Sequence, residues 1–358
     1  MEIAVLGGGN GSLAAAVDLT EAGHQVRLWR RDAAVVETML ASGPLKLKDH
    51  AGSREVVLSK ITSDLAEAID GAALIVCPTP ATAQADIAAR LALLLRDGQV
   101  VFMPPGTFGS YIIAKAMRDA GNAADASFAE SGTLPWLTRK HGEKTIAITT
   151  RASRLPTGVI PLKNKDYALG VIRQAFPSVE DCGDALSGAL MNAGPIIHPP
   201  LILMNAGPIQ HFEHWDIHNE GTQPAIRSVT TALDAERMAV REALGYGAPH
   251  FPLADHYNTD QWMYGNLAHD KLTDSGDWRE KLILTQHRYM REDVQLALAF
   301  LVSVADWAGV PCPVAKGLLA LGGAICGEDF MQTGRTLGSL GLDSLDRKAM
   351  TALLETGP

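Results

Sequence analysis

The sequence is poor in cysteine and has no surplus of positive charge. Its four cysteines show no CxxC spacing, which favours reduced thiols over a disulfide framework or a zinc site. A formal net charge of −9 argues against nucleic acid or an anionic membrane as the main partner. No apolar run reaches the roughly 18 residues that span a bilayer. The first expected strand, 3–6, lies at the very start of the sequence, so we expect no signal or transit peptide and a cytoplasmic protein.

The chain is long and apolar enough for two packed domains. It has 358 residues, of which 47% are hydrophobic and 20% charged, a composition typical of globular chains. Strand-like and helical segments alternate up to about residue 180, and long segments with helical periodicity follow. Such alternation is typical of a parallel sheet with both faces covered. We predict an α/β Rossmann-type doubly wound domain over 1–180 and an all-α domain over 181–358.

The expected elements follow from the period of the apolar residues. Strands are expected at 3–6, 25–29, 45–47, 56–59, 73–77, 99–103, 126–130, 145–149 and 157–161. After the first helix, which follows strand 3–6, helices are expected at 33–42, 65–69, 81–95, 110–120, 185–204, 223–244, 286–307 and 313–325.

A glycine-rich turn follows the first strand and precedes a helix-forming run, with a second strand, 25–29, close behind. This order is the one that a dinucleotide-binding βαβ unit requires. Gly7 lets the chain turn sharply, Gly9 lets a pyrophosphate approach the backbone, and Ser12 is the small third position. Free amides at the start of the helix would face the phosphates. The predicted cofactor-binding residues of this turn are Gly7, Gly9, Asn10, Gly11 and Ser12.

The end of the second strand indicates which dinucleotide is bound. NAD sites usually place an acid there for the ribose 2′-hydroxyl, whereas a 2′-phosphate favours arginine. Here Arg30, Arg31 and Asp32 follow Trp29, and two guanidinium groups favour NADP. NAD stays the alternative, because Asp32 could turn in toward the ribose. Pro78, at the carboxyl end of strand 73–77, is expected to pass beside the cofactor.

A dinucleotide oxidoreductase also needs a group that transfers a proton near neutral pH, which histidine does best. Among eleven histidines, His198 lies in an apolar segment with no other charge nearby. Asp293 opens a mostly apolar helix, so its carboxylate would need a partner. We predict that Asp293 orients His198. The alternatives are an ordinary interior histidine and an acid that only stabilises a helix N-terminus.

These residues lie in motifs that together resemble the opine dehydrogenase family, which includes octopine and nopaline synthases and the carboxyethyl-norvaline dehydrogenase type. The resemblance covers nearly the whole chain, with several motifs in the same order. They are GGGNG at the N-terminal turn, NAGPIIHPP around His198, DAERMAVREALG (234–245), HRYMREDV (287–294), WAGVPCP (307–313) and GRTLGSLGL (334–342).

The resemblance implies an enzyme that performs reductive condensation. A 2-oxo acid, usually pyruvate, and the amino group of an amino acid form an imine, which NAD(P)H reduces to a secondary amine. By analogy His198 transfers the proton, Asp293 is its partner, Arg288 binds a substrate carboxylate and Asn192 contacts substrate. Where the family often has a second asparagine this chain has Gly194. Related enzymes are monomers or homodimers, so the oligomeric state stays open.

The segment 205–222 is rich in histidine, tryptophan and acids and is expected to line the amino-acid side of the site. On a helix, His211, His214 and His218 would share one face, which is a spacing that zinc could use. We expect no metal, because loop histidines are common and the family does not require one.

Two other readings remain. One is a ketopantoate-reductase-like or glycerol-phosphate-dehydrogenase-like ketone reductase, which would rely on a lysine that the His198 segment lacks. The other is a non-catalytic NADP sensor, which would bind the cofactor without turnover.

Overall fold

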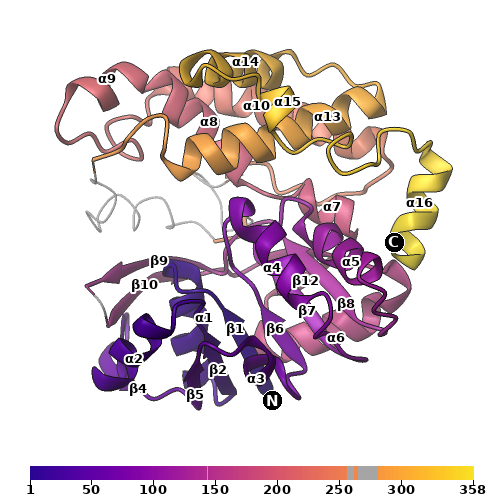
Figure 1. Ribbon diagram of the computed structural model, residues 1–358. Helices are drawn as coiled ribbons and strands as arrows, with labels where there is room; N and C mark the ends of the chain where they lie inside the picture. Colours follow the sequence, from indigo (N-terminus) through magenta and orange to yellow (C-terminus); the bar gives the residue numbers. More distant parts are fainter. Residues whose placement is uncertain (143, 256–261, 265–280) are drawn as a thin grey trace. The chain divides into compact units, whose positions relative to one another are not determined.

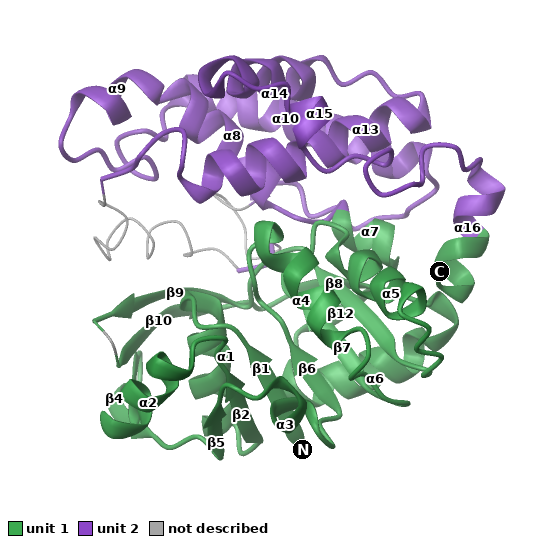
Figure 2. Ribbon diagram, viewed as in Figure 1, with its two compact units in different colours: residues 1–189, 352–358 green, residues 190–351 purple. Residues whose placement is uncertain are grey.

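The computed structural model describes residues 1–142, 144–255, 262–264 and 281–358, which form two compact units (Figure 1). Unit 1 comprises Met1–Ala189 together with Ala352–Pro358, and unit 2 comprises Leu190–Thr351 (Figure 2). The last residues of the chain therefore return to the unit in which the chain began.

The units divide beyond the boundary predicted at residue 180. Strand β12 (Val179–Asp184) pairs in parallel with β11 (Leu155–Ile160). Helix α7 (Ala185–Ala189) then packs against β11 and β8 (Ser127–Ser131). Because these elements complete the sheet and cover it, they belong to unit 1.

Unit 1 is built on an eight-stranded sheet in the order β12-β11-β8-β7-β6-β1-β2-β5. From β5 to β8 this is the strand order 3-2-1-4-5-6 of a dinucleotide-binding fold, and it confirms the predicted doubly wound class. All neighbours are parallel except β11 and β8. The strands not yet given bounds are β1 (Glu2–Leu6), β2 (Gln25–Trp29), β5 (Lys60–Thr62), β6 (Leu74–Val76) and β7 (Val100–Met103).

The central strands form because their residues are apolar on both faces. Ile3 to Leu6 of β1 and Leu74 to Val76 of β6 are fully buried, as expected for a parallel sheet covered by helices. Neighbouring strands are in register, with Ile3 opposite Val26 and Leu74. Besides α7, the α-helices of unit 1 include α1 (Asn10–Glu21), α2 (Ala33–Ala41), α3 (Leu65–Ile69), α4 (Gln84–Leu91), α5 (Gly109–Asp119) and α6 (Lys165–Ala175).

A second, four-stranded sheet has the order β4-β3-β10-β9. Its strands are β3 (Leu45–Asp49), β4 (Gly52–Val56), β9 (Trp136–His141) and β10 (Thr145–Arg151). It packs against α1, where Asp18 accepts hydrogen bonds from Trp136 Nε1 at 2.7 Å and Arg151 at 2.6 Å. The strand predicted at 56–59 is wrong, because β4 ends at Val56. β9, β12 and α6 were not predicted.

Unit 2 is helical, and its described residues contain no strand, which confirms the predicted all-α class. Its elements are α8 (Gly194–Met204), α9 (Ala206–His211), α10 (Pro224–Ala243), the π-helix Tyr289–Leu298, α13 (Ala299–Ala308), α14 (Pro313–Cys326), α15 (Phe330–Thr333) and α16 (Arg347–Thr356), whose end lies in unit 1. The helix predicted at 185–204 is broken, because α7 ends at Ala189 and α8 begins at Gly194. Within the described chain, no helix has the length and apolar character needed to cross a membrane.

Candidate active site

The structure brings His198 and Asp293 together, although they are far apart in the sequence. Helix α8 carries His198 and packs along the π-helix, which carries Asp293. His198 Nδ1 lies 2.8 Å from Asp293 Oδ2. Extended π-helical turns are rare and often occur at functional sites. The pairing predicted for these two side chains is therefore present in the structure.

Burial controls the electrostatics of this pair. Asp293 is only 5% exposed, and burial raises the pKa of its carboxyl to about 7, while the charge of Arg288 lowers it. When the carboxylate is ionised it accepts the Nδ1 hydrogen of His198, which leaves Nε2 as the nitrogen that can exchange a proton with a substrate. Burial therefore brings the pKa of the Asp293 carboxyl close to neutral pH.

Two further side chains lie close to His198. The ring of Tyr289 is stacked on the His198 ring, with centroids 3.7 Å apart and planes 9° from parallel. The Tyr289 hydroxyl lies 3.0 Å from Nε2 of His218, which is also buried. Neither residue was predicted in these roles. Tyr289 lies in the HRYMREDV motif, so its nearness to Asp293 in the sequence was the available signal.

The histidines at 211, 214 and 218 do not share a helical face. His211 is the last residue of α9, and His214 is exposed in the segment that follows. Only His218 approaches His198, with ring centroids 6.2 Å apart. The spacing that suggested zinc therefore forms no common helical surface.

The predicted substrate-binding residues lie at the two helices of the pair. Arg288 is exposed, and its guanidinium carbon is 5.4 Å from the centroid of the Tyr289 ring. Asn192 is buried, and its Oδ1 accepts a hydrogen bond of 2.9 Å from the Gly194 amide. A Cβ on Gly194 would lie 2.3 Å from Asp293 Oδ1. The carboxylate that orients His198 therefore occupies the space that a side chain at position 194 would need.

The glycine-rich turn is tight at Gly7 and open at Gly9. Gly7 has φ +106°, and a Cβ on it would lie 2.7 Å from Ser12 Oγ, which donates to the Leu6 carbonyl at 3.0 Å. A Cβ on Gly9 would meet no atom within 4 Å, so the start of α1 is open there. The Asn10 side chain is engaged elsewhere, because its Oδ1 accepts a 2.9 Å hydrogen bond from the Lys140 amide. Asn10 can therefore offer a phosphate its backbone amide.

The loop after β6 lies against this turn. A Cβ on Gly11 would come 3.2 Å from Cβ of Pro78 and 2.8 Å from Leu134, and one on Gly7 would come 3.4 Å from Thr79. β1 and β6 are neighbours at the point where the strand order reverses, which is where nucleotides bind in this fold. Pro78 is therefore adjacent to the predicted cofactor site.

The three side chains that follow β2 make different contacts. The Arg30 guanidinium lies across Gly8, where a Cβ would come within 1.9 Å of its central carbon. Arg31 is exposed and lies 3.4 Å from Asp86. Asp32 caps helix α2 by accepting from the amides of Ala34 and Val35. Arg30 thus lies on the glycine turn, while the Asp32 carboxylate is used by the helix.

One buried carboxylate in unit 1 escaped the sequence prediction. Glu130, at the carboxyl end of β8, is fully buried and accepts hydrogen bonds from the Phe108 amide at 2.7 Å and from Ser110 Oγ at 2.5 Å. Thr107 and Phe108 have positive φ angles of 54° and 62°. Glu130 therefore fixes the strained loop after β7 at the edge of the sheet where cofactors bind.

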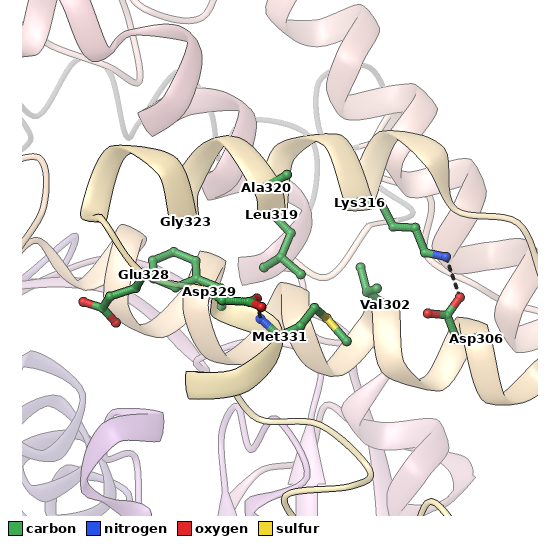
Figure 3. A pocket seen from close by; sticks show the side chains of 10 residues that line it. Val302, Asp306, Lys316, Leu319, Ala320, Gly323, Glu328, Asp329 and Met331 are labelled. Atoms are coloured by element: carbon green, nitrogen blue, oxygen red, sulfur yellow. Dashed lines mark hydrogen bonds and ion pairs between the residues drawn. The ribbon is translucent and has the colours of Figure 1, made fainter.

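A hollow of about 380 Å³ lies on unit 2 beside α13, α14 and α15 (Figure 3). Leu319 and Met331 are among its lining residues, and an ion pair of 2.6 Å joins Lys316 to Asp306. None of the predicted site residues lines it. The hollow is therefore separate from the His198 pair.

Comparison with known proteins matches both halves of the chain. Residues 181–326 match the family model of the NAD/NADP octopine/nopaline dehydrogenase alpha-helical domain. Residues 2–119 match the model of the NAD-dependent glycerol-3-phosphate dehydrogenase N-terminus. The opine dehydrogenase of Arthrobacter sp. (strain 1C) is 26% identical over 355 residues, which covers 98% of each chain.

Solved structures agree with the fold. An octopine dehydrogenase with NADH and pyruvate has a TM-score of 0.71 at 22% identity and covers 98% of both chains. A yersinopine dehydrogenase with NADP+ bound has a TM-score of 0.65 at 15% identity and covers 99% of this chain and 98% of its own.

The Rossmann sheet with its open glycine turn and the helical domain define an NAD(P)-dependent oxidoreductase. The domain order and the matched helical domain narrow this class further. The helical domain matches the octopine/nopaline dehydrogenase family model, and the chain over nearly its whole length is similar to an opine dehydrogenase.

Proposed function

We propose that this protein is an NADPH-preferring opine dehydrogenase. It would join a 2-oxo acid, pyruvate in the first instance, to the amino group of an amino acid and reduce the resulting imine to a secondary amine. The His198–Asp293 pair, set in the matched helical domain, is the observation that carries the proposal. Structures of octopine dehydrogenase bound to NADH with pyruvate, with L-arginine or with agmatine support the substrate class.

The proton steps suit a buried histidine–carboxylate pair. An ammonium group must lose a proton before its nitrogen can attack the oxo carbon, and His198 Nε2 would take that proton. The resulting carbinolamine must lose water, and the protonated His198 would return the proton to the leaving hydroxyl. Asp293 would stabilise the imidazolium between these steps. When bound, the nicotinamide supplies the hydride that reduces the imine carbon.

The substrate contacts follow from the same helices. Arg288 has the fork of donors that binds a carboxylate in two places, and both reactants carry a carboxylate. Asn192 lies two residues before the first residue of α8 and six before His198. We assign Arg288 to a substrate carboxylate and Asn192 to the substrate side of α8.

The preference for NADPH rests on the turn after β2. Arg30 lies over the glycine turn with a charge suited to a 2′-phosphate, and Arg31 adds a second. Asp32 would have to leave the cap of α2 to serve an NAD ribose. Removing such a cap costs about 1 kcal/mol, which disfavours the NAD arrangement.

The test is oxidation of NADPH and of NADH by the purified protein, with pyruvate and with or without a panel of amino acids. We expect turnover that requires both reactants and prefers NADPH. His198→Ala should lower kcat by about 10² to 10⁴-fold, the usual effect of losing a general acid–base group. His50→Ala, an exposed histidine in a turn of unit 1, is the matched control and should leave turnover unchanged.

Other outcomes would point to other functions. Oxidation with an oxo acid or dihydroxyacetone phosphate alone would indicate a ketone reductase, a reading that the glycerol-3-phosphate dehydrogenase match of residues 2–119 keeps in view. Cofactor binding without turnover on the whole panel would indicate a sensor.

A further inference from the structure

His198 is held by more than its bond to Asp293. The Nδ1 to Oδ2 contact of 2.8 Å fixes one point of the imidazole, and a contact at one nitrogen does not by itself fix the plane of a ring. Tyr289 stacks on the ring at 3.7 Å with planes 9° apart. The stack therefore fixes the plane of the imidazole and the direction of Nε2.

Tyr289 is itself fixed at its far end. Its side chain is 3% exposed, and its hydroxyl bonds to His218 Nε2 at 3.0 Å. His218 is held in turn, because the buried Asp216 accepts a hydrogen bond from its backbone amide at 3.0 Å. These contacts form a chain from the segment after α9 to the reacting ring.

The same tyrosine also contacts the predicted carboxylate anchor. Arg288 lies 5.4 Å from the centroid of the Tyr289 ring. One rigid ring therefore touches the group that would transfer the proton and the group that would hold the substrate. A displacement of Tyr289 would change the distance between the two.

We propose that Tyr289 is a positioning residue that sets the plane of His198 and its spacing from Arg288, and that His218 acts through the Tyr289 hydroxyl. The proposal rests on the proposed function for the roles of His198 and Arg288. Its geometric part concerns only how His198 is held.

The charges around His198 define what should change. Asp293 lies in the π-helix, and Arg288 is the residue just before that helix. The His287 ring packs edge-on against Tyr289, with ring centroids 4.5 Å apart. His218 comes from the segment after α9. Helix α8 carries no other titratable side chain. The aromatic face of Tyr289 favours a positive charge on the stacked imidazole, as in cation–π contacts.

The first experiment measures the pKa of His198 by NMR titration of the full-length protein. Tyr289→Leu removes the aromatic face and should lower that pKa by about 0.5 to 1.5 units. Tyr289→Phe keeps the aromatic face, so the pKa of His198 should stay at its wild-type value. Tyr167→Leu, an exposed tyrosine of unit 1, is the control. An unchanged pKa in Tyr289→Leu would overturn the proposal, and this readout does not depend on turnover.

The second experiment uses kinetics. Tyr289→Phe and His218→Ala should each lower kcat by about 2- to 10-fold, the effect of one hydrogen bond, with KM for NADPH unchanged. The double variant should be no worse than either single variant if His218 acts through the hydroxyl, as proposed. His218→Gln offers an amide to the hydroxyl and should recover most of the loss. Additive losses in the double variant would refute the role of His218.

Folding and function can be separated in this design. If Tyr289→Leu fails to fold, the kinetic comparison of Tyr289→Phe, His218→Ala and the double variant tests the proposal. If the wild type shows no turnover with an oxo acid and an amine, the proposed function fails, while the titration still tests how His198 is held.

Discussion

Asp293→Asn should lower activity and raise stability above neutral pH. The change keeps the shape of the side chain but removes a carboxylate that the fold buries beside His198. An asparagine oxygen can still accept from His198 Nδ1, so the ring stays in place. The loss is the charge that favours the imidazolium, and such charge-assisted bonds contribute about 1.5–3 kcal/mol. We expect kcat to fall by about 10- to 150-fold.

The stability change follows from the pKa of Asp293. Burial raises this pKa to about 7, against about 3.9 in an unfolded chain. Between these values the folded state holds a proton that the unfolded state has released, so stability falls as pH rises from about 4 to about 7. The slope is about 1.4 kcal/mol per pH unit and the total about 4 kcal/mol. Asparagine removes this cost, and after loss of the charged bond the variant should gain about 1–3 kcal/mol at pH 8.

The assay is denaturant unfolding of both proteins at pH 5, 6, 7 and 8, followed by circular dichroism. Stability of the wild type relative to the variant should decline across this range and level off above about pH 7. Parallel pH profiles, or a variant less stable at pH 8, would refute the view that Asp293 is buried at a cost in free energy. An unchanged kcat would refute its role as the partner of His198.

Three further substitutions test single contacts. Gly194→Ala places a methyl group 2.3 Å from Asp293 Oδ1, so it should displace the carboxylate. Steady-state kinetics should then show kcat lowered by about 10- to 100-fold, which corresponds to the loss of one charged hydrogen bond. Gly8→Ala should displace the Arg30 side chain from the turn. In fluorescence titration we expect the Kd of NADPH to rise by about tenfold, the effect of losing one charged contact, while the Kd of NADH changes little. Asp32→Ala removes the cap of α2 and should destabilise unit 1 by about 1 kcal/mol in denaturant unfolding, with the NADPH preference kept.

The two glycine substitutions each have a matched control. Gly317→Ala and Gly170→Ala add the same methyl group where nothing lies within 4 Å, and neither should alter kcat or cofactor affinity. Equal losses in Gly194→Ala and Gly317→Ala would mean that helix disturbance rather than Asp293 is responsible. A shift toward NADH in Asp32→Ala would show that Asp32 opposes that cofactor in some way other than capping.

The sequence was sufficient to predict those strands of the nucleotide-binding sheet that are buried on both faces. β1 and β6 are apolar on both faces, so no other structure suits them. β9 reads WLTRKH, with charges on a half-exposed strand, and its pairing with β10 is decided by tertiary structure. β12 carries acids and is a strand only because β11 offers it an edge.

The part of the site that could be predicted is the His198–Asp293 pair, because each of these polar residues lies in an apolar segment and needs a partner. A histidine and a carboxylate, each in an apolar segment, indicated a pair, and the family resemblance named it. The stack of Tyr289 on His198 and the contact of Arg30 with Gly8 depend on the approach of segments that no local pattern records. Domain boundaries were least predictable, since Ala352–Pro358 return to unit 1.

That return has a consequence for how the protein is made. Unit 2 is an insertion in unit 1, and Gly357 lies beside Pro161, where a Cβ on it would come within 3.1 Å of the proline ring. At synthesis rates of about 5–20 residues per second, the ribosome needs roughly ten to thirty seconds to add Leu190–Thr351 before the last residues of unit 1 emerge. The nucleotide-binding unit, although first to be translated, is thus the last to be completed.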